Sequence, residues 1–116
     1  MDQGRWMRSM LLDFYGALLT DKQRECYDLH YNEDLSLSEI AEQSGISRQG
    51  VWDNIRRAEA ALEEIEEKTG LIRRLEGTKR ALETIRRQAQ ALEASKEDKT
   101  REIAGQILQE IHRLEE

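Results

Sequence analysis

The fold of this chain is decided by residues 37–55, which read LSEIAEQSGISRQGVWDNI. Apolar residues recur at helical spacing on both sides of Gly45. Two helices that cross steeply after a short turn need a small residue where their backbones approach, and Ala41 provides it. They also need a permissive backbone at the turn, which Gly45 provides. The pattern predicts a helix-turn-helix, and an ordinary helical hairpin is the alternative.

Capping residues mark the expected ends of the helices around this stretch. Thr20 with Gln23, and Ser36 with Glu39, have the spacing of capping boxes, in which the hydroxyl and the longer side chain each accept a backbone N–H. Ser47 is placed to cap the helix that follows the turn. The expected helices of the module cover about residues 20–31, 37–44 and 47–69, with Gly70 as a stop.

Apolar spacing predicts further helices on either side of the module. A first helix over about residues 5–18 is expected to have one face formed by Met7, Met10, Leu11, Phe14 and Leu18. Beyond Gly70, apolar residues alternate spacings of three and four as far as Leu92, which is typical of a coiled coil. A polar break at residues 95–99 precedes a last amphipathic helix with Ile103, Ile107, Ile111 and Leu114 on one face. No proline interrupts any of these segments, so the predicted fold is all-α.

We expect two parts, a helix-turn-helix domain at residues 1–69 and a C-terminal helical extension at residues 70–116. An apolar stripe on so small a chain must be covered, either by a second copy or by packing back within the chain. The heptads favour a homodimer, because many helix-turn-helix proteins read two half-sites as symmetric pairs. The expected dimer contacts are Leu75, Leu82, Ile85 and Leu92.

The helix after the turn is predicted to be the recognition helix. A rotation of 100° per residue leaves Gln49, Asp53 and Arg56 near the centre of its outward face. Ser47 and Arg48 lie at its N-terminal end, where recognition helices meet phosphates and base edges. Packing on a neighbouring helix is favoured for Trp52 over stacking on a base. The predicted nucleic-acid-binding residues are Ser47, Arg48, Gln49, Asn54, Arg56 and Arg57.

Charge counts against this interpretation. The chain has 24 acidic and 18 basic side chains, a net charge of -6, whereas phosphate contacts come from clustered lysine and arginine. Asp53 also opposes phosphate, although a carboxylate can accept from a cytosine amino group. Arg56 and Arg57 have a competing role, which is to pair with Glu59 and Glu63 on their own helix. Strong binding therefore requires that basic side chains gather locally.

Other classes of function are disfavoured. The single cysteine, Cys26, lacks an activating motif, and His30 and His112 do not have metal-ligand spacing beside it. No glycine-rich phosphate loop and no isolated pair of carboxylates is present. We therefore expect no enzyme activity, cofactor, metal site or small-molecule substrate. No apolar run is long enough to span a bilayer or to serve as a secretion signal, which predicts a cytoplasmic protein without membrane contact.

Several stretches match known helix-turn-helix proteins. LTDKQ at residues 19–23, EDLSLSEIAE at residues 33–42 and GISRQ at residues 45–49 are similar to the fourth conserved region of bacterial sigma factors, which reads a promoter element. With LLDFYG at residues 11–16 and SRQGVWDNI at residues 47–55 added, the chain more closely resembles the YlxM family of small bacterial proteins. The C-terminal extension matches less well.

The resemblance implies two functions. Members of that family are associated with the signal recognition particle pathway and have been regarded as regulators. One implied function is a DNA-binding transcriptional regulator that acts through Ser47, Arg48, Gln49, Asn54 and Arg56. The other is an accessory protein that binds the particle's GTPase or its RNA. DNA binding is the leading hypothesis, and the acidic charge balance favours the alternative.

Overall fold

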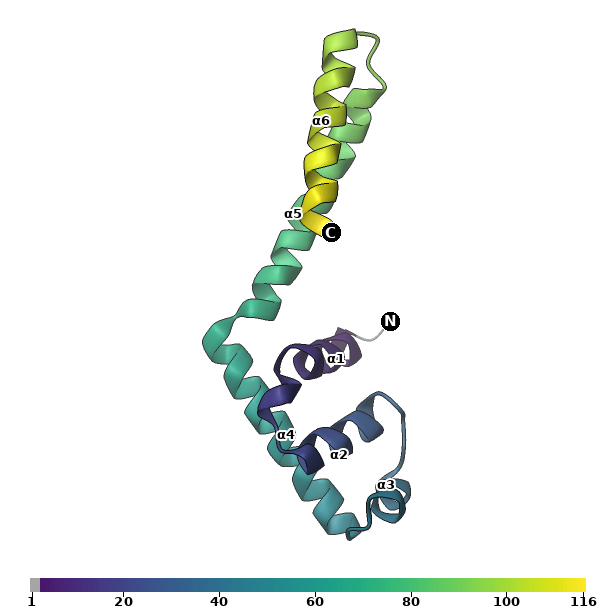
Figure 1. Ribbon diagram of the computed structural model, residues 1–116, viewed down its shortest axis with the longest axis vertical. Coiled ribbons are helices and arrows are strands. Elements are labelled where there is room, and N and C mark those ends of the chain that lie inside the picture. The colour runs from purple at the N-terminus through teal and green to yellow at the C-terminus, as the bar shows by residue number, and fades with distance from the viewer. Residues whose placement is uncertain (1–2) are drawn as a thin grey trace. The chain divides into compact units, whose positions relative to one another are not determined.

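The computed structural model describes residues 3–116, and every regular element within them is a helix (Figure 1). The all-α prediction is therefore confirmed. The chain divides into two compact units, the first ending at Ile72 and the second beginning at Arg73. The elements are α1 (Gln3–Tyr15), a 3-10 turn η1 (Gly16–Leu18), α2 (Asp21–Tyr31), α3 (Leu37–Ser44), α4 (Arg48–Thr69), α5 (Leu71–Glu93) and α6 (Asp98–Glu115).

Both predicted capping boxes are present at the starts of α2 and α3. The Thr20 hydroxyl accepts from the backbone N–H of Gln23 at 3.2 Å, and the Gln23 side chain accepts from the backbone N–H of Thr20 at 3.2 Å. Ser36 and Glu39 make the same reciprocal pair. These bonds satisfy N–H groups that have no partner inside a helix, so short helices can begin at defined residues.

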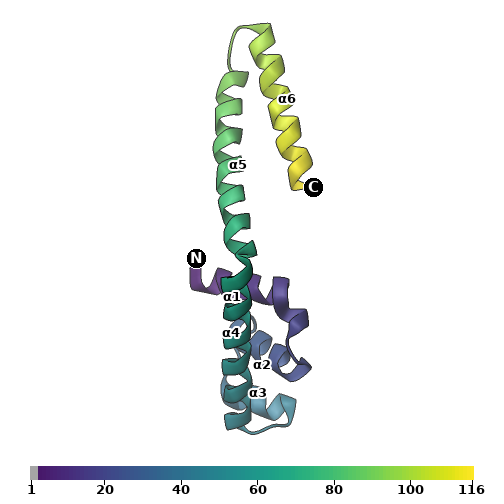
Figure 2. The same ribbon diagram turned by 90° about the vertical axis from the view of Figure 1, so that its left-hand side faces the viewer.

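The first unit is built around one face of α4. Val51, Ile55, Ala58 and Leu62 recur along that face, and each is 0% exposed. α1, α2 and α3 all pack against α4, as Figure 2 shows. The N-terminal part of the face meets Cys26 and Ile40, and the C-terminal part meets Leu11, Tyr15, Leu19, Tyr27 and Ile72.

The predicted core face of α1 is confirmed in part. Leu11 is buried and Met7 and Met10 pack against the core, whereas Phe14 and Leu18 are 45% and 70% exposed, so the prediction is wrong for these two. Tyr15, four residues after Leu11, takes the core position in place of Phe14. For Leu18 the reason lies in the end of the helix. α1 stops at Tyr15, and the tighter 3-10 turn that follows rotates Leu18 toward solvent and Leu19 toward the core.

A buried carboxylate joins the end of α4 to the start of α5. Glu66 is 8% exposed, and its Oε1 accepts from the Tyr15 hydroxyl at 2.8 Å and from the backbone N–H of Ile72 at 3.1 Å. Gly70 ends α4 in the left-handed conformation, with φ +62°. Because Ile72 is in the first turn of α5, Glu66 satisfies an otherwise orphaned N–H. Burial raises the pKa of Tyr15, which keeps its hydroxyl protonated and able to donate.

The second unit is a hairpin in which α5 and α6 run antiparallel, as both ribbon views show (Figures 1 and 2). Residues 94–97 connect them, which overlaps the polar break predicted at residues 95–99, and α6 begins inside that predicted break at Asp98. Ala89 of α5 and Ala104 and Ile111 of α6 are buried in the hairpin. Arg86 pairs with Glu83 of its own helix and with Glu115 of α6.

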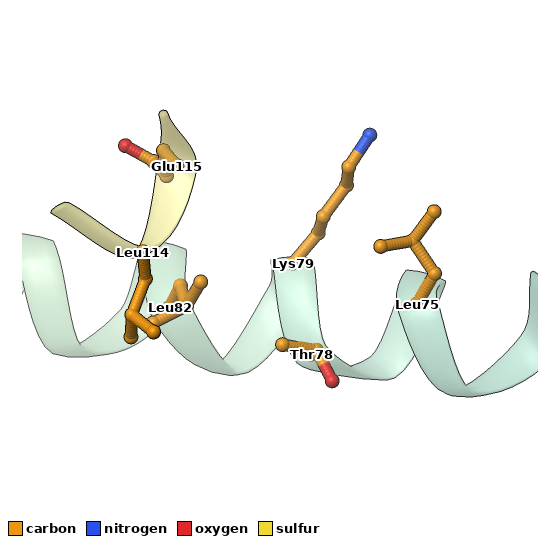
Figure 3. Close-up of a pocket in the computed structure, with 6 residues that line it drawn as sticks. All are labelled: Leu75, Thr78, Lys79, Leu82, Leu114 and Glu115. Carbon is orange, nitrogen blue, oxygen red and sulfur yellow. The ribbon is translucent and has the colours of Figure 1, made fainter. Parts of the chain in front are cut away.

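The hairpin leaves part of its apolar surface uncovered. Ile85 and Leu92 are 42% and 46% exposed, and Leu114 is 71% exposed. Leu75 and Leu82 are half-buried and, with Leu114, line a hollow of about 410 Å³, and Figure 3 shows Leu82 next to Leu114 and Leu75 farther along α5. Packing within the chain therefore covers only part of the heptad seam. Among residues 3–116, none of the helices combines the length and the apolar character needed to cross a membrane.

Leu62→Ala should lower the free energy of unfolding by about 2–5 kcal/mol, because it leaves a cavity in the fully buried face of α4. Leu18→Ala is the matched control, since the same atoms are removed from a side chain that is 70% exposed, and it should cost less than about 0.5 kcal/mol. Chemical denaturation of both variants measures the difference. Equal losses would contradict the assignment of the core.

Candidate nucleic-acid interface

α3 and α4 form the predicted helix-turn-helix. α3 ends at Gly45, whose backbone is left-handed with φ +71° and whose N–H donates to the Ala41 carbonyl at 3.0 Å. A Cβ built on Gly45 would meet no atom within 4 Å. Glycine is therefore favoured by its backbone conformation and not by lack of space. The turn is short because Ser47 caps α4 directly, its Oγ accepting from the Gly50 N–H at 3.0 Å.

The crossing of the two helices is fixed by a small, fully buried cluster. The cluster consists of four side chains that are each 0% exposed, namely Cys26 of α2, Ile40 of α3, and Val51 and Ile55 of α4. Because this cluster holds α4 at one rotation about its axis, it determines which side chains face outward. Burial also raises the pKa of the Cys26 thiol, so the residue behaves as a small apolar side chain and not as a nucleophile.

The predicted binding residues differ in how exposed they are and in whether their polar atoms are already hydrogen-bonded. Arg48, Gln49, Arg56 and Arg57 are exposed on α4, as expected. The Ser47 hydroxyl is exposed, and its oxygen is engaged in the cap. Asn54 is on the flank of the helix and half-buried, and its side-chain amide donates to the carbonyl of Gly50 at 2.8 Å.

The exposed arginines of α4 are not neutralised by neighbouring carboxylates. Within the part of the chain that the structure describes, Arg48, Arg56 and Arg57 form no ion pair. The competing role for Arg56 and Arg57, pairing with Glu59 and Glu63, is not seen among the described residues, and Glu59 instead accepts from the Tyr31 hydroxyl. Residues 48–57 contain three arginines and one aspartate, a net charge of +2 within a chain of net charge -6. Basic side chains therefore do gather at the start of α4.

Trp52 belongs to this surface, although the sequence favoured its packing on a neighbouring helix over a contact with a base. It is 39% exposed, so part of its side chain is open to solvent. The Arg56 guanidinium lies over its ring, 5.4 Å from the ring centre, which is cation–π geometry. An open hollow of about 570 Å³ is lined by Leu37, Arg48, Gln49 and Trp52. Arg48, Trp52 and Arg56 are spaced four residues apart, so all three lie along one stripe of the helix. That spacing is the signal in the sequence that could have assigned Trp52 to this surface.

We call Arg48, Gln49, Trp52, Arg56 and Arg57 the recognition surface. It combines cations, an amide and an exposed aromatic ring on the N-terminal half of a helix held by a helix-turn-helix. This is the chemistry that contacts phosphates and base edges. Among residues 3–116, no group of three or more histidine, cysteine, aspartate or glutamate side chains could hold a metal ion.

Comparison with known proteins agrees with this geometry. Residues 2–103 match the model of the family described as "Putative helix-turn-helix protein, YlxM / p13 like". The chain belongs to this family. A UPF0122 protein of Thermoanaerobacter sp. is 43% identical over 115 residues, which cover 98% of each chain. One of Bacillus cereus is 42% identical over 105 residues, 90% of this chain and 91% of the relative. One of Geobacillus kaustophilus is 55% identical over 76 residues, 66% of this chain and 69% of the relative.

Family membership confirms the resemblance found in the sequence. The family is described by its helix-turn-helix and is not a family of enzymes. A helix-turn-helix is the type of module that ordinarily binds nucleic acid, so membership and geometry lead to the same general function for this YlxM/p13-like protein.

Ser47→Ala should destabilise the protein by about 1 kcal/mol, because the Gly50 N–H loses its cap. Ser47→Asp should remain within a few tenths of a kcal/mol of the wild type, since a carboxylate also caps and suits the helix dipole. Thermal or chemical unfolding of the two variants separates these outcomes. If both lose stability equally, the capping role of Ser47 is refuted.

Proposed function

We propose that this YlxM/p13-like protein is a DNA-binding transcriptional regulator that places the N-terminal half of α4 in the major groove. The observation that carries this proposal is the recognition surface, with three exposed arginines that form no ion pair within residues 3–116. Double-stranded DNA demands cations for its phosphates and hydrogen-bonding side chains for its bases. DNA as the ligand implies a cytoplasmic site of action.

Each residue of the predicted interface has a role in this proposal. Arg48 and the N–H groups at the start of α4 bind a phosphate, with the Ser47 hydroxyl donating its own proton beside them. Gln49 meets a base edge, and Arg56 and Arg57 hold phosphates farther along the groove. Asn54, whose amide is partly used by its own helix, has one N–H and its carbonyl left for a contact at the flank.

We further propose that the protein acts as a homodimer through its α5–α6 hairpin. Two helices alone cannot enclose a core, and the hairpin exposes Ile85, Leu92 and Leu114 while Leu75 and Leu82 line a hollow. A second hairpin packed on this face would cover those side chains as a four-helix bundle does. A two-fold dimer also presents two recognition helices, which suits half-sites about 34 Å apart.

A second candidate function is an accessory role in the signal recognition particle pathway. The net charge of -6 and the exposed Glu39 and Glu42 on α3, beside the recognition surface in sequence, favour it, because they weaken attraction to duplex DNA. In that case the same surface would contact the particle's RNA or its GTPase.

The double substitution Arg48→Ala and Gln49→Ala should lower duplex affinity at least about tenfold and reduce the slope of log affinity against log salt by about 1. The fold should remain intact, because both side chains are exposed. Fluorescence anisotropy with labelled genomic duplex over a salt series measures both quantities.

The control for this experiment is Arg24→Ala, which removes an exposed arginine of α2 that pairs with Asp21. An equal loss in the control would show that only overall charge matters. The wild type is also titrated with the particle's RNA and its GTPase. Saturable binding to either of them, with no binding to duplex, would overturn DNA binding in favour of the accessory role.

Leu82→Glu combined with Ile85→Glu should convert the dimer to a monomer, because two charges would be buried at the hairpin face. Sedimentation velocity measures the change. Leu18→Glu is the matched control, since it adds a charge at a side chain that is 70% exposed in the first unit, and it should leave the dimer intact. A wild-type protein that sediments as a monomer would contradict the dimer.

A further inference from the structure

Gln49 and Asp53 form a polar pair at the centre of the outward face of α4. Gln49 is the second residue of the helix, Asp53 lies one turn later, and both are exposed. The Gln49 side-chain nitrogen, Nε2, donates to Asp53 Oδ1 at 3.1 Å. Asp53 is the only acidic side chain in residues 48–57, and it opposes the phosphates that the proposed function requires. Its presence on this face therefore needs an explanation.

The hydrogen bond fixes which way the Gln49 amide points. A carboxylate has no proton to donate, so only the NH₂ end of the amide can bond to it. The carbonyl end of Gln49 must then turn away from Asp53. Without Asp53 the two ends of the amide could exchange places by a simple rotation. With Asp53 present, one N–H donor and one carbonyl acceptor remain free in a fixed order.

A donor beside an acceptor complements only one of the purines in the major groove. Adenine presents an acceptor, N7, next to a donor, the N6 amino group, whereas guanine presents two acceptors, N7 and O6. We infer that Gln49 reads an adenine and that Asp53 is the positioning residue that orients its amide. This inference rests on the proposed DNA binding and adds to it the base that is recognised.

The charge of Asp53 is tolerable in this position because cations are close to it. Arg56 and Arg57 follow it by three and four residues, so they are its neighbours on the helix surface. Asp53 then lowers the overall attraction to phosphate while raising the discrimination between bases. Removing Asp53 should therefore raise the affinity for duplex DNA and lower the preference for one base. A merely structural role of Asp53 would not change these two quantities in opposite directions.

The test is a selection of binding sites from a randomised duplex library, followed by affinity measurements on the selected site with each base at one position. The proteins are the full-length wild type, Gln49→Ala, Asp53→Ala and Asp53→Asn. We expect the wild type to require adenine at one position, with guanine there about tenfold weaker. Gln49→Ala should lose that preference and leave the other positions of the site unchanged.

The two Asp53 variants separate charge from orientation. Both remove the negative charge, so both should bind all duplexes more tightly at low salt. Only asparagine keeps an oxygen that can accept from Gln49 Nε2, so Asp53→Asn should retain most of the adenine preference. Asp53→Ala should weaken that preference, because the amide keeps its donor and acceptor but is no longer held in one order.

Four outcomes would overturn the inference. An unchanged adenine preference in Asp53→Ala would remove the positioning role, and an unchanged site in Gln49→Ala would remove the reading role. A cytosine requirement that disappears in both Asp53 variants would assign base contact to the carboxylate itself. In these three cases DNA binding stands and only the inference fails. No duplex binding by the wild type would reject the proposed function together with the inference.

Discussion

The burial of one face of α4 is the constraint on which the rest of the first unit depends. Val51, Ile55, Ala58 and Leu62 are 0% exposed and meet residues from every preceding helix. Because a packed helix cannot rotate without opening voids, this face fixes the rotation of α4 about its axis. Side chains on the opposite face are fixed with it. The outward position of the recognition surface is therefore a consequence of the core.

Polar groups and glycines at the helix ends fix the residues at which the helices begin and end. Capping residues begin α2, α3 and α4, and Gly45 and Gly70 end α3 and α4 in the left-handed conformation. Glu66 extends this control to the first turn of α5 by accepting from Tyr15 and Ile72. The capping side chains and Glu66 accept from backbone or hydroxyl donors that would otherwise lose a hydrogen bond on folding, and Gly45 and Gly70 donate their N–H groups to carbonyls in the last turns. Helix lengths are thereby set within a residue or two.

Charge is distributed so that a net acidic chain still has a positive region. Residues 48–57 have a net charge of +2 against -6 for the whole chain. Such a protein is attracted to nucleic acid over a short range only, since its acidic residues repel phosphate at a distance. Contacts made by named side chains at the start of α4 then matter more than overall attraction. The inferred role of the Gln49–Asp53 pair fits this arrangement, because an oriented amide would discriminate between bases where overall attraction is weak.

The sequence by itself determined the helices and the helix-turn-helix. Capping boxes, glycine stops and apolar spacing act within a few residues, so they can be read before the fold is known. Tertiary structure decided which side chains at the C-terminal end of α1 are buried, because the 3-10 turn after Tyr15 changes the residue spacing that the pattern assumes. The Gln49–Asp53 hydrogen bond is a contact between residues four apart on one helix, so the sequence spacing already permits it. Tertiary structure decided that this pair and Trp52 lie on an exposed face, because contacts of α4 with α2 and α3 set its rotation.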